Sequence, residues 1–184
     1  MKEALLLIDI QRDYFPGGRM EVVGSELAAQ RAQNLLISFR EKGKKIIHIQ
    51  HVSTREGATF FLPGTDGVNI HESVLPGAGE TVITKHFPNS FRDTILEDQL
   101  RKNEIEKIFF CGMMSHMCID ATVRAAFDLG FECVVAEDAC ATRDLSFKGV
   151  EVPSTQVHAA YMAALGAVYA TVVQSSEIIE QMST

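Results

Sequence analysis

Residues 109–131, FFCGMMSHMCIDATVRAAFDLGF, contain the pattern that decides the fold of this chain. The apolar run that begins at Phe109 predicts a buried strand, and Gly112 ends it. A helical pattern then begins near Cys118 and stops at Gly130, a residue suited to the left-handed end of a helix. A second apolar run, FECVVAE, follows at once and predicts another strand. The stretch is therefore a strand–helix–strand unit, and such a unit joins two parallel strands of one sheet.

The same alternation of strands and helices continues along the rest of the chain. Apolar runs predict strands over residues 3–10, 44–52, 81–84, 107–111, 131–137 and 167–173. Helical patterns lie between them, over residues 26–42, 93–103, 118–130 and 154–165, with a last helix from about 176. Ser25 has the position of an N-cap residue, and Gly43 that of a C-terminal stop. Strands that alternate with helices predict an α/β fold with a parallel sheet covered on both faces.

One long segment has no regular pattern. Residues 53–80 are rich in Gly and Pro, and a loop of this length inside a compact domain is often functional. The length of 184 residues predicts one domain, residues 1–184. We expect this loop, or a neighbouring subunit, to close any pocket at the surface of that domain.

The composition excludes several classes of protein. The net charge of −7 disfavours nucleic acid and anionic membrane surfaces as partners. No apolar run reaches the ~18–20 residues of a membrane span, and the apolar start of the chain is too short for a signal peptide. The four cysteines form no CxxC pair, so neither a zinc knuckle nor a thioredoxin-like motif is expected. We therefore expect a cytoplasmic protein with reduced cysteines, no membrane partner and no nucleic-acid partner.

Three chemically reactive side chains stand where predicted strands end. Asp9 ends the first strand, Lys85 ends the third, and Cys118 follows the fourth. The carboxyl ends of the strands in an open α/β sheet meet at one edge, where ligands bind. A carboxylate, an ammonium and a thiol at one edge are the groups that nucleophilic catalysis needs. Each also has a structural explanation: Asp9 as a partner of loop amides, Lys85 as a solvated strand end, and Cys118 as a core thiol.

Cys118 has features that would activate it as a nucleophile. A position near a helix N-terminus and a nearby Lys85 would both lower the pKa of its thiol, and Asp9 would accept the proton. The backbone amides of Met114 and Cys118 would form an oxyanion hole. Gly112 gives the turn before them the backbone freedom that this arrangement needs.

At these residues the sequence resembles the isochorismatase-like cysteine hydrolase superfamily, whose members include nicotinamidases, N-carbamoylsarcosine amidases and streptothricin hydrolases. The resemblance covers nearly the whole chain and rests on ALLLIDIQRDYF, PGAGETVITKHFPNSF, CGMMSHMCIDATVRAAFDLGF and AEDACAT. It implies a catalytic triad of Asp9, Lys85 and Cys118, with a cis peptide bond between Met113 and Met114. It also implies a Rossmann-like, three-layer α/β/α sandwich around a six-stranded parallel sheet, assembled as a homodimer or homotetramer.

The chain departs from related enzymes at the place of a metal motif. Nicotinamidases carry an Asp-x-His motif after the second strand, where this chain reads HIQHVSTREG. His48 and His51 are three apart on a strand, so they face opposite sides and make a poor chelate. We expect them to be packed or rim histidines, and we expect no catalytic metal and no cofactor.

Aromatic residues gather around the same predicted edge, as is typical of a pocket for a small-molecule substrate. They are Tyr14, Phe15, Phe60, Phe61, Phe87 and Phe91. We expect Phe15, Phe61 and Phe91 to form the walls, although each also fits a loop anchor packed on the core. His116, two residues before the thiol, fits a substrate contact or a second acid/base group. It fits better as a turn residue or as a residue that faces a neighbouring subunit.

The residues and the resemblance together predict a cysteine-dependent hydrolase of a small amide, ureido compound or lactam. Asp9 would deprotonate Cys118, the thiolate would attack the carbonyl, and water activated by Asp9 would hydrolyse the thioester. Isochorismatases that cleave a vinyl ether tend to lack the nucleophilic cysteine, so its presence favours acyl transfer. Two alternatives stay open: vinyl-ether hydrolysis of the isochorismate type, and a non-catalytic thiol or redox protein with the same fold.

Overall fold

Within residues 1–183, which the computed structural model describes, six parallel strands form one sheet in the order β3-β2-β1-β4-β5-β8. The strands are β1 (Glu3–Ile8), β2 (Lys45–His51), β3 (Thr81–Lys85), β4 (Lys107–Met113), β5 (Glu132–Ala141) and β8 (Thr171–Val173). Every neighbouring pair in this sheet is parallel. Because each strand overlaps a predicted apolar run, the predicted strands and their parallel arrangement are confirmed.

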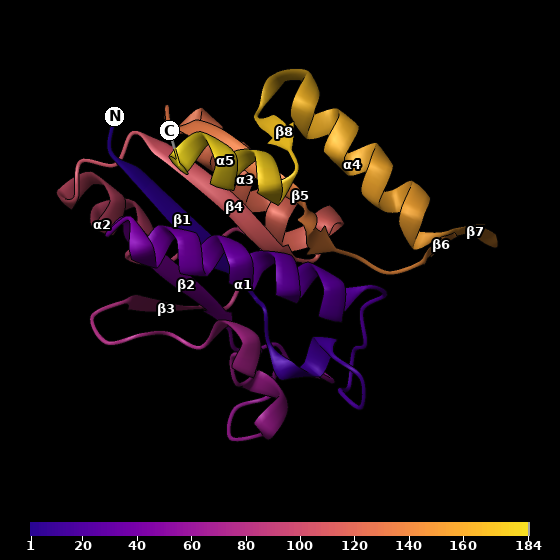
Figure 1. Ribbon diagram of the computed structural model, residues 1–184. Coiled ribbons are helices and arrows are strands. Elements are labelled where there is room, and N and C mark those ends of the chain that lie inside the picture. Colours follow the sequence, from indigo (N-terminus) through magenta and orange to yellow (C-terminus); the bar gives the residue numbers. More distant parts are fainter. Residues whose placement is uncertain (184) are drawn as a thin grey trace.

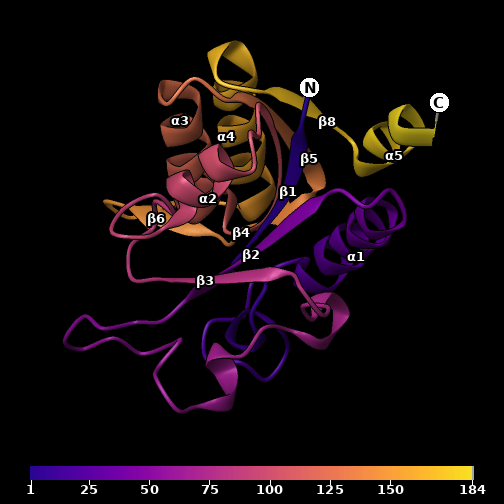
Figure 2. The ribbon, with the colours of Figure 1, turned by 90° about the vertical axis from the view of Figure 1, so that its left-hand side faces the viewer.

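Helices cover both faces of the sheet. On one face lie α1 (Ser25–Glu41) and α5 (Ser175–Ser183), as Figure 1 shows. On the other lie α2 (Leu96–Lys102), α3 (Asp120–Asp128) and α4 (Ser154–Val168). Figure 2 shows the sheet between these two helical layers. The expected three-layer α/β/α sandwich is therefore the observed fold.

The central strand β1 is apolar on both sides because both of its faces are covered. Leu5 and Leu7 pack into the core beneath α1 and α5, with Phe39 of α1. Leu6 and Ile8 pack into the core beneath the other three helices. All five side chains are at most 2% exposed. Burial of each such side chain contributes about 1.5–3 kcal/mol, so this strand fixes both layers to the sheet.

The strand order reverses between β1 and β4. On one side of this point the order runs β1, β2, β3, and on the other it runs β4, β5, β8. Ligands of open α/β sheets bind outside the carboxyl ends of the strands at such a reversal. Asp9 directly follows β1, and the turn that leads to Cys118 directly follows β4. The topology therefore brings these two residues to the same place.

Some local features differ from the prediction. A small antiparallel hairpin of β6 (Leu145–Phe147) and β7 (Val150–Val152) was not predicted, since three-residue strands leave little pattern. The N-cap of α1 is Gly24, with φ 76°, whereas Ser25 is already helical. The helix α4 continues through Gly166, which was expected to end it.

The long loop over residues 53–80 contains only short helical turns. They are η2 (Asp66–Val68) and η3 (Glu72–Val74). A third short turn, η1 (Arg12–Tyr14), follows β1 and is joined to the loop by a bridge between Gln11 and Ile70. Among the helices of the described residues, none has the length and hydropathy needed to cross a membrane.

Candidate active site

The structure brings together the three reactive side chains that the sequence singled out. The Lys85 Nζ lies 2.8 Å from the Asp9 Oδ2. Both side chains are fully buried, and Cys118 is 5% exposed. A carboxylate oxygen of Asp9, the Cys118 Sγ and a ring nitrogen of His51 all lie within 4.8 Å of one another. A carboxylate, an ammonium, a thiol and an imidazole therefore form one cluster at the strand reversal.

Backbone contacts at the strand ends hold the ion pair in place. The backbone of Asp9 turns out of β1 with φ 52°, and its N–H donates to the Ile49 carbonyl of β2. Lys85 is the last residue of β3, and its ammonium also donates to the Pro88 carbonyl at 2.8 Å. Since both residues are fixed at the ends of core strands, the pair is a rigid part of the sheet edge.

The turn between β4 and α3 delivers Cys118 to this pair. Gly112 has φ 131°, and a Cβ there would lie 2.0 Å from the Ile8 carbonyl oxygen. The peptide bond between Met113 and Met114 is cis, at the position that the resemblance implies. A π-helical turn, η4 (Ser115–Ile119), then runs into α3. Cys118 thus lies inside this turn, whereas the sequence suggested that the helix begins at the cysteine.

The electrostatics of Cys118 correct one expectation. Burial raises the pKa of its thiol well above the ordinary value, and the negative charge of Asp9 raises it further. Lys85 acts in the opposite direction, but its contribution is smaller. Burial also acts to lower the pKa of Lys85, yet the charges of Asp9 and Cys118 outweigh this and raise it. The predicted lowering of the thiol pKa is therefore wrong for the resting protein, which holds a thiol beside a charged pair.

This protonation state has a chemical consequence. A buried thiolate next to Asp9 would place two negative charges beside a single ammonium. The thiolate therefore forms only if its proton moves to an adjacent base, and the Asp9 carboxylate is in position to accept it. The cluster is suited to general-base activation of a thiol rather than to a permanently ionised one.

The sequence analysis missed the place of His51 in this cluster. His51 was expected to be a packed or rim histidine, but it ends β2 and pairs in register with Lys85 of β3. Its backbone is held by the side-chain amide of the fully buried Gln11. The Gln11 Nε2 donates to the His51 carbonyl at 2.9 Å, and the Gln11 Oε1 accepts from the His51 N–H at 2.7 Å. The sequence feature that could have pointed to His51 was its position at the end of a predicted strand, like Asp9 and Lys85.

A second missed residue, Asp13, ties the long loop to the segment after β1. Its carboxylate is 2% exposed. It accepts hydrogen bonds from the backbone N–H groups of Phe61, at 2.6 Å, and of Arg19, at 3.1 Å. The loop also passes close by at Gly67, where a Cβ would lie 2.0 Å from the Asp13 Oδ1. Asp13 therefore fixes the path of the loop from inside.

The three predicted wall residues occupy different surroundings. Phe61 is 1% exposed and packs against Tyr14 and the ring of His51, with centroids 4.6 and 5.9 Å apart respectively. Phe15 instead stacks on His71. Phe91 stacks on Phe131, in the core beneath α2, α3 and α4. Of these three aromatic rings, that of Phe61 is the one that packs against the imidazole of His51, a member of the cluster.

Tyr14 also lies beside the cluster. Burial raises the pKa of its hydroxyl well above the ordinary value, and the charges of Cys118 and Asp9 raise it further. A tyrosine with such a pKa keeps its proton at neutral pH and acts as a hydrogen-bond donor. Tyr14 therefore adds a neutral donor to one side of the site.

His116 anchors the turn to the rest of the molecule. Its Nδ1 hydrogen-bonds the Thr142 Oγ1 at 2.5 Å, and its ring packs edge-on against Tyr161 of α4. Burial lowers its pKa, so it is neutral at physiological pH. These contacts fit the expected turn residue.

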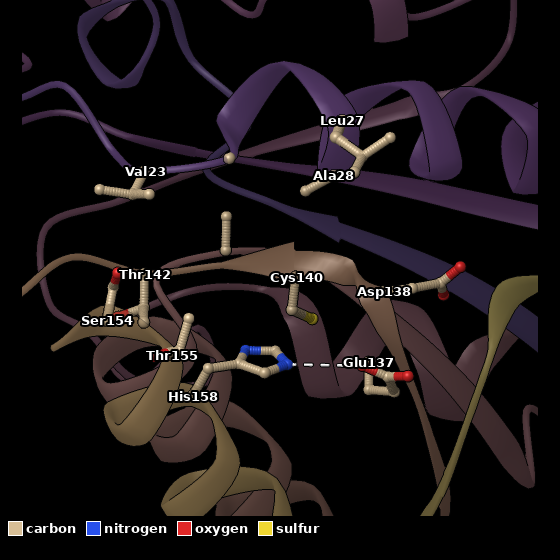
Figure 3. Close-up of a pocket in the computed structure, with 12 residues that line it drawn as sticks. Val23, Leu27, Ala28, Glu137, Asp138, Cys140, Thr142, Ser154, Thr155 and His158 are labelled. Carbon is tan, nitrogen blue, oxygen red and sulfur yellow. Dashed lines mark ion pairs between the residues drawn. The ribbon is translucent and has the colours of Figure 1, made fainter.

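A separate hollow of about 270 Å³ opens between the start of α1, the end of β5 and the start of α4 (Figure 3). Its lining includes His158, Glu137 and Cys140 but none of the triad. The His158 Nδ1 lies 2.9 Å from the Ser115 Oγ, and the His158 Nε2 lies 3.5 Å from Glu137. Since Ser115 begins the π-helical turn, His158 supports that turn from α4.

The same cluster contains atoms that bind metals in other proteins. Carboxylate, imidazole and thiolate groups are all ligands of divalent metals such as Zn²⁺. Here the buried ammonium of Lys85 lies 2.8 Å from Asp9, so a cation would meet a fixed positive charge. We therefore assign no metal to these residues, and the absence of a catalytic metal stays a prediction.

Comparison with known proteins places this geometry in a family. An isochorismatase domain matches residues 3–176. The chain is 54% identical over 172 residues to the uncharacterized isochorismatase family protein YddQ of Bacillus subtilis, with 94% of this chain and 96% of that protein covered. It is 33% identical over 145 residues to a streptothricin hydrolase of Streptomyces noursei, with 78% of this chain and 51% of that protein covered.

The solved structures agree with this. The crystal structure of a candidate isochorismatase hydrolase from Oleispira antarctica superposes with a TM-score of 0.94 at 51% sequence identity, covering 97% of this chain and 96% of that one. The domain match spans nearly the whole chain, and both the sheet order and the strand-end residues lie within it. This chain therefore belongs to the isochorismatase family.

Proposed function

We propose that the protein is a cysteine-dependent hydrolase that cleaves a C–N bond of a small amide, ureido compound or lactam through a thioester. One observation carries the proposal. The Lys85 Nζ lies 2.8 Å from the Asp9 Oδ2, and the thiol of Cys118 adjoins this buried pair. A vinyl-ether hydrolase has no use for a nucleophilic thiol at this point, whereas acyl transfer requires one.

The first half of the reaction forms the thioester. Asp9 takes the thiol proton of Cys118 as the sulfur bonds to the substrate carbonyl carbon. The backbone amides of Met114 and Cys118 stabilise the oxyanion, a contribution of about 3–4 kcal/mol for each such donor. Asp9 then passes its proton to the leaving nitrogen as the C–N bond breaks.

Lys85 keeps the site electrically balanced during this step. When the proton moves from Cys118 to Asp9, the negative charge moves from the carboxylate to the sulfur. The ammonium of Lys85 is held near both groups, so it stabilises either arrangement. Its bond to the Pro88 carbonyl keeps it in place throughout.

The second half of the reaction hydrolyses the thioester. A water oxygen bonds to the carbonyl carbon, the C–S bond breaks, and the sulfur regains a proton. The products are a carboxylic or carbamic acid and the amine released in the first half. The amide class of substrate is supported by the name of a relative, the maleamate amidohydrolase of Pseudomonas putida, and by the thiol at position 118.

A screen of amides, ureides and lactams tests the proposal. Wild-type protein and Cys118→Ala are assayed against each compound for released ammonia or amine. We expect at least one compound to be hydrolysed by the wild type and not measurably by Cys118→Ala. A hit that Cys118→Ala cleaves equally well contradicts the thioester mechanism. Turnover of isochorismate that survives Cys118→Ser would instead support a vinyl-ether hydrolase.

A further inference from the structure

His51 is the member of the cluster that solvent reaches. Asp9 and Lys85 are fully buried and Cys118 is nearly so, whereas His51 is partly exposed at the carboxyl end of β2. One of its ring nitrogens lies within 4.8 Å of the Cys118 Sγ and of an Asp9 oxygen. Of these groups, the imidazole of His51 is therefore the one that is both accessible to water and close to the sulfur.

The backbone of His51 is held in place, while its ring nitrogens form no hydrogen bond within the described residues. Its backbone is fixed by the two hydrogen bonds to Gln11, and Gln11 is itself held by a bond to the Val68 carbonyl at 2.7 Å. No hydrogen bond to its ring nitrogens is recorded among residues 1–183. By contrast, the ring of His48 on the same strand is committed to Glu80 at 2.8 Å. The His51 ring thus keeps both nitrogens available for chemistry.

We propose that His51 is a catalytic residue of the second half-reaction; this inference rests on the proposed function. His51, rather than Asp9 as the sequence analysis expected, is the base that activates the water which hydrolyses the thioester. As the water oxygen bonds to the carbonyl carbon, a water proton moves to the free nitrogen of His51. The C–S bond then breaks, and the imidazolium returns that proton to the Cys118 sulfur. The cycle ends with a neutral imidazole and a thiol, as in the resting protein.

Two features of the cluster divide the proton transfers between Asp9 and His51. The carboxylate of Asp9 is fully buried and paired with Lys85, so it is placed to serve the buried sulfur and the leaving nitrogen. His51 lies at the rim, where water enters after the leaving group departs. Burial lowers the pKa of His51, and Lys85 and His86 add to this while Asp9 opposes it. The imidazole is therefore neutral at pH 7 and able to accept a proton.

The test separates the two half-reactions with p-nitrophenyl acetate as the probe. Acylation of Cys118 releases p-nitrophenolate in a rapid burst, and deacylation sets the later steady rate. For His51→Gln we expect a burst close to one equivalent of protein and a steady rate at least roughly 10²-fold below wild type. Intact-mass spectrometry should show an added acetyl group on His51→Gln and none on the Cys118→Ala/His51→Gln double variant.

Two further variants make the result specific. His86→Gln removes an imidazole that is exposed and bonded to the Val52 carbonyl, so it should retain the wild-type steady rate. His51→Ala opens a space at the base, so added imidazole should accelerate its deacylation and leave that of His51→Gln unchanged. The melting temperature of His51→Gln should stay close to wild type, because the ring nitrogens of His51 form no hydrogen bond within residues 1–183. His51→Ala also loses the packing of this ring against Phe61, so it should melt at a slightly lower temperature.

The outcomes distinguish this inference from the proposed function. If His51→Gln slows the burst and the steady rate equally and no acyl-protein accumulates, His51 does not act in deacylation and the inference fails. In that case Cys118-dependent hydrolysis by the wild type would leave the proposed function standing. If the wild type shows no Cys118-dependent acylation by the probe or in the substrate screen, the proposed function fails, and the inference fails with it.

Discussion

Asp9 raises the pKa of the thiol that it is proposed to deprotonate. Its negative charge disfavours a thiolate at Cys118, second in effect only to burial, and Lys85 opposes it. The carboxylate thus keeps the sulfur protonated until a substrate carbonyl arrives to accept the electron pair. At the scale of single residues, the proposed mechanism therefore has the thiolate form in the same step in which it attacks.

The variant Asp9→Asn should separate thiolate formation from hydrolysis. It removes a negative charge that raises the pKa of Cys118 and leaves Lys85, which lowers it. We expect the pKa of Cys118 to fall, so that iodoacetamide alkylates this residue faster than in wild type at neutral pH. Hydrolysis of a compound found in the screen should fall by roughly 10²–10⁴-fold because the base is lost. Peptide mass spectrometry measures alkylation against pH.

A carboxylate elsewhere on the same sheet edge provides the control. Asp138 accepts two hydrogen bonds from Ser175 and lies outside the triad. Asp138→Asn should leave both the alkylation rate and the hydrolysis rate close to wild type. Slower alkylation in Asp9→Asn than in wild type would show that Asp9 does not hold the proton on the sulfur.

The sequence predicted that Asp9, Lys85 and Cys118 lie together, as they do in the structure, but it did not predict their neighbours, and the reason is physical. Asp9 and Lys85 each end an apolar strand, and Cys118 follows one across a glycine turn, so their positions stand out from the pattern. His51 also ends a strand, but it joins the cluster only because the register of β2 and β3 pairs it with Lys85. Gln11 positions His51 by binding its backbone, and the two residues are far apart in the sequence. Strand register and long-range hydrogen bonds cannot be predicted from the local pattern of residues.

At the scale of elements, β1 and β4 approach each other so closely that one position between them requires glycine. At Gly112 a Cβ would lie 2.0 Å from the Ile8 carbonyl oxygen of β1. Gly112→Ala should reduce the free energy of unfolding by about 1–3 kcal/mol through the backbone conformation alone, and overpacking against β1 should add a similar amount. Urea unfolding measures the loss.

The hairpin turn offers a matched glycine without the steric conflict. Gly149 also has a positive φ, of 80°, but no atom lies within 4 Å of a Cβ built there. Gly149→Ala should therefore show only the cost of its backbone conformation. If the two variants lose the same stability, the close approach of β1 and β4 is not what requires Gly112.

A polar cluster that includes the buried His48, the partly buried Glu80 and the exposed Arg40 fixes the edge of the sheet where β3 packs on β2. The Arg40 side chain of α1 donates to both carboxylate oxygens of Glu80, at 2.7 and 2.9 Å, and His48 of β2 contacts the same carboxylate. Mainly through the bonds from Arg40, the pKa of Glu80 is lowered from 4.5 to about 2. A lowered carboxylate pKa stabilises the fold above the unfolded value, and this stabilisation is lost as the pH falls.

Glu80→Gln should therefore remove a pH-dependent part of the stability. At pH 7 we expect the variant to unfold with a free energy about 1–2 kcal/mol below wild type, because solvent screens the exposed Arg40 and weakens its ion pair with Glu80. The difference should shrink as the pH falls from 4.5 towards 2, where Glu80 becomes protonated. Urea unfolding at several pH values measures it. Glu104→Gln, which changes an exposed partner of Lys2, serves as the control, and an equal effect in both variants would contradict the assignment.

Regular elements were easier to predict than irregular ones. The buried strands read as continuous apolar runs because helices cover both of their faces. The π-helical turn over Ser115–Ile119 left no such signal, since its path depends on contacts with Thr142 and His158 on other elements. The β6–β7 hairpin was also missed, because its two short strands project from the body beside α4 (Figure 1).

At the scale of the whole molecule, α4 presents an apolar face to the outside. Its inner side chains, such as Met162 and Leu165, pack into the core. Its exposed face consists of Ala159, Ala160, Ala163, Ala164, Ala167 and Val168. No charged residue occurs from 159 to 176, although the chain as a whole carries a net charge of −7. An uncharged face lets a second copy pack about a two-fold axis without like-charge repulsion.

We therefore propose that the protein is a homodimer or homotetramer in which this face is buried between copies. Ala164→Glu should shift it towards the monomer, because two carboxylates would be buried against each other. Multi-angle light scattering after gel filtration measures the mass. Gln30→Glu, an exposed change on α1, should leave the assembly intact. A wild-type monomer at micromolar concentration, or an unchanged mass for Ala164→Glu, would contradict this proposal.

The overall architecture followed from the sequence only in part. The alternation of strands and helices predicted a parallel sheet with two helical layers, and the resemblance implied six strands. The residue pattern left the strand order open, because many orders satisfy the same pattern. The observed reversal between β1 and β4 is what makes Asp9 and Cys118 neighbours, and it results from the packing of all the strands together.

The buried carboxylate of Asp13 helps to attach the long loop over residues 53–80 to a sheet edge that is built separately from it. Asp13 holds the loop over residues 53–80 at Phe61, Gln11 holds it at Val68 and Ile70, and the clustered polar groups come from strand ends with their own backbone supports. Another loop sequence could therefore be placed between β2 and β3 to alter substrate preference, provided that it keeps the carbonyl at position 68 that holds Gln11 and, through it, His51. Such a graft should succeed only when it presents a backbone N–H to Asp13 and keeps a glycine where Gly67 passes it.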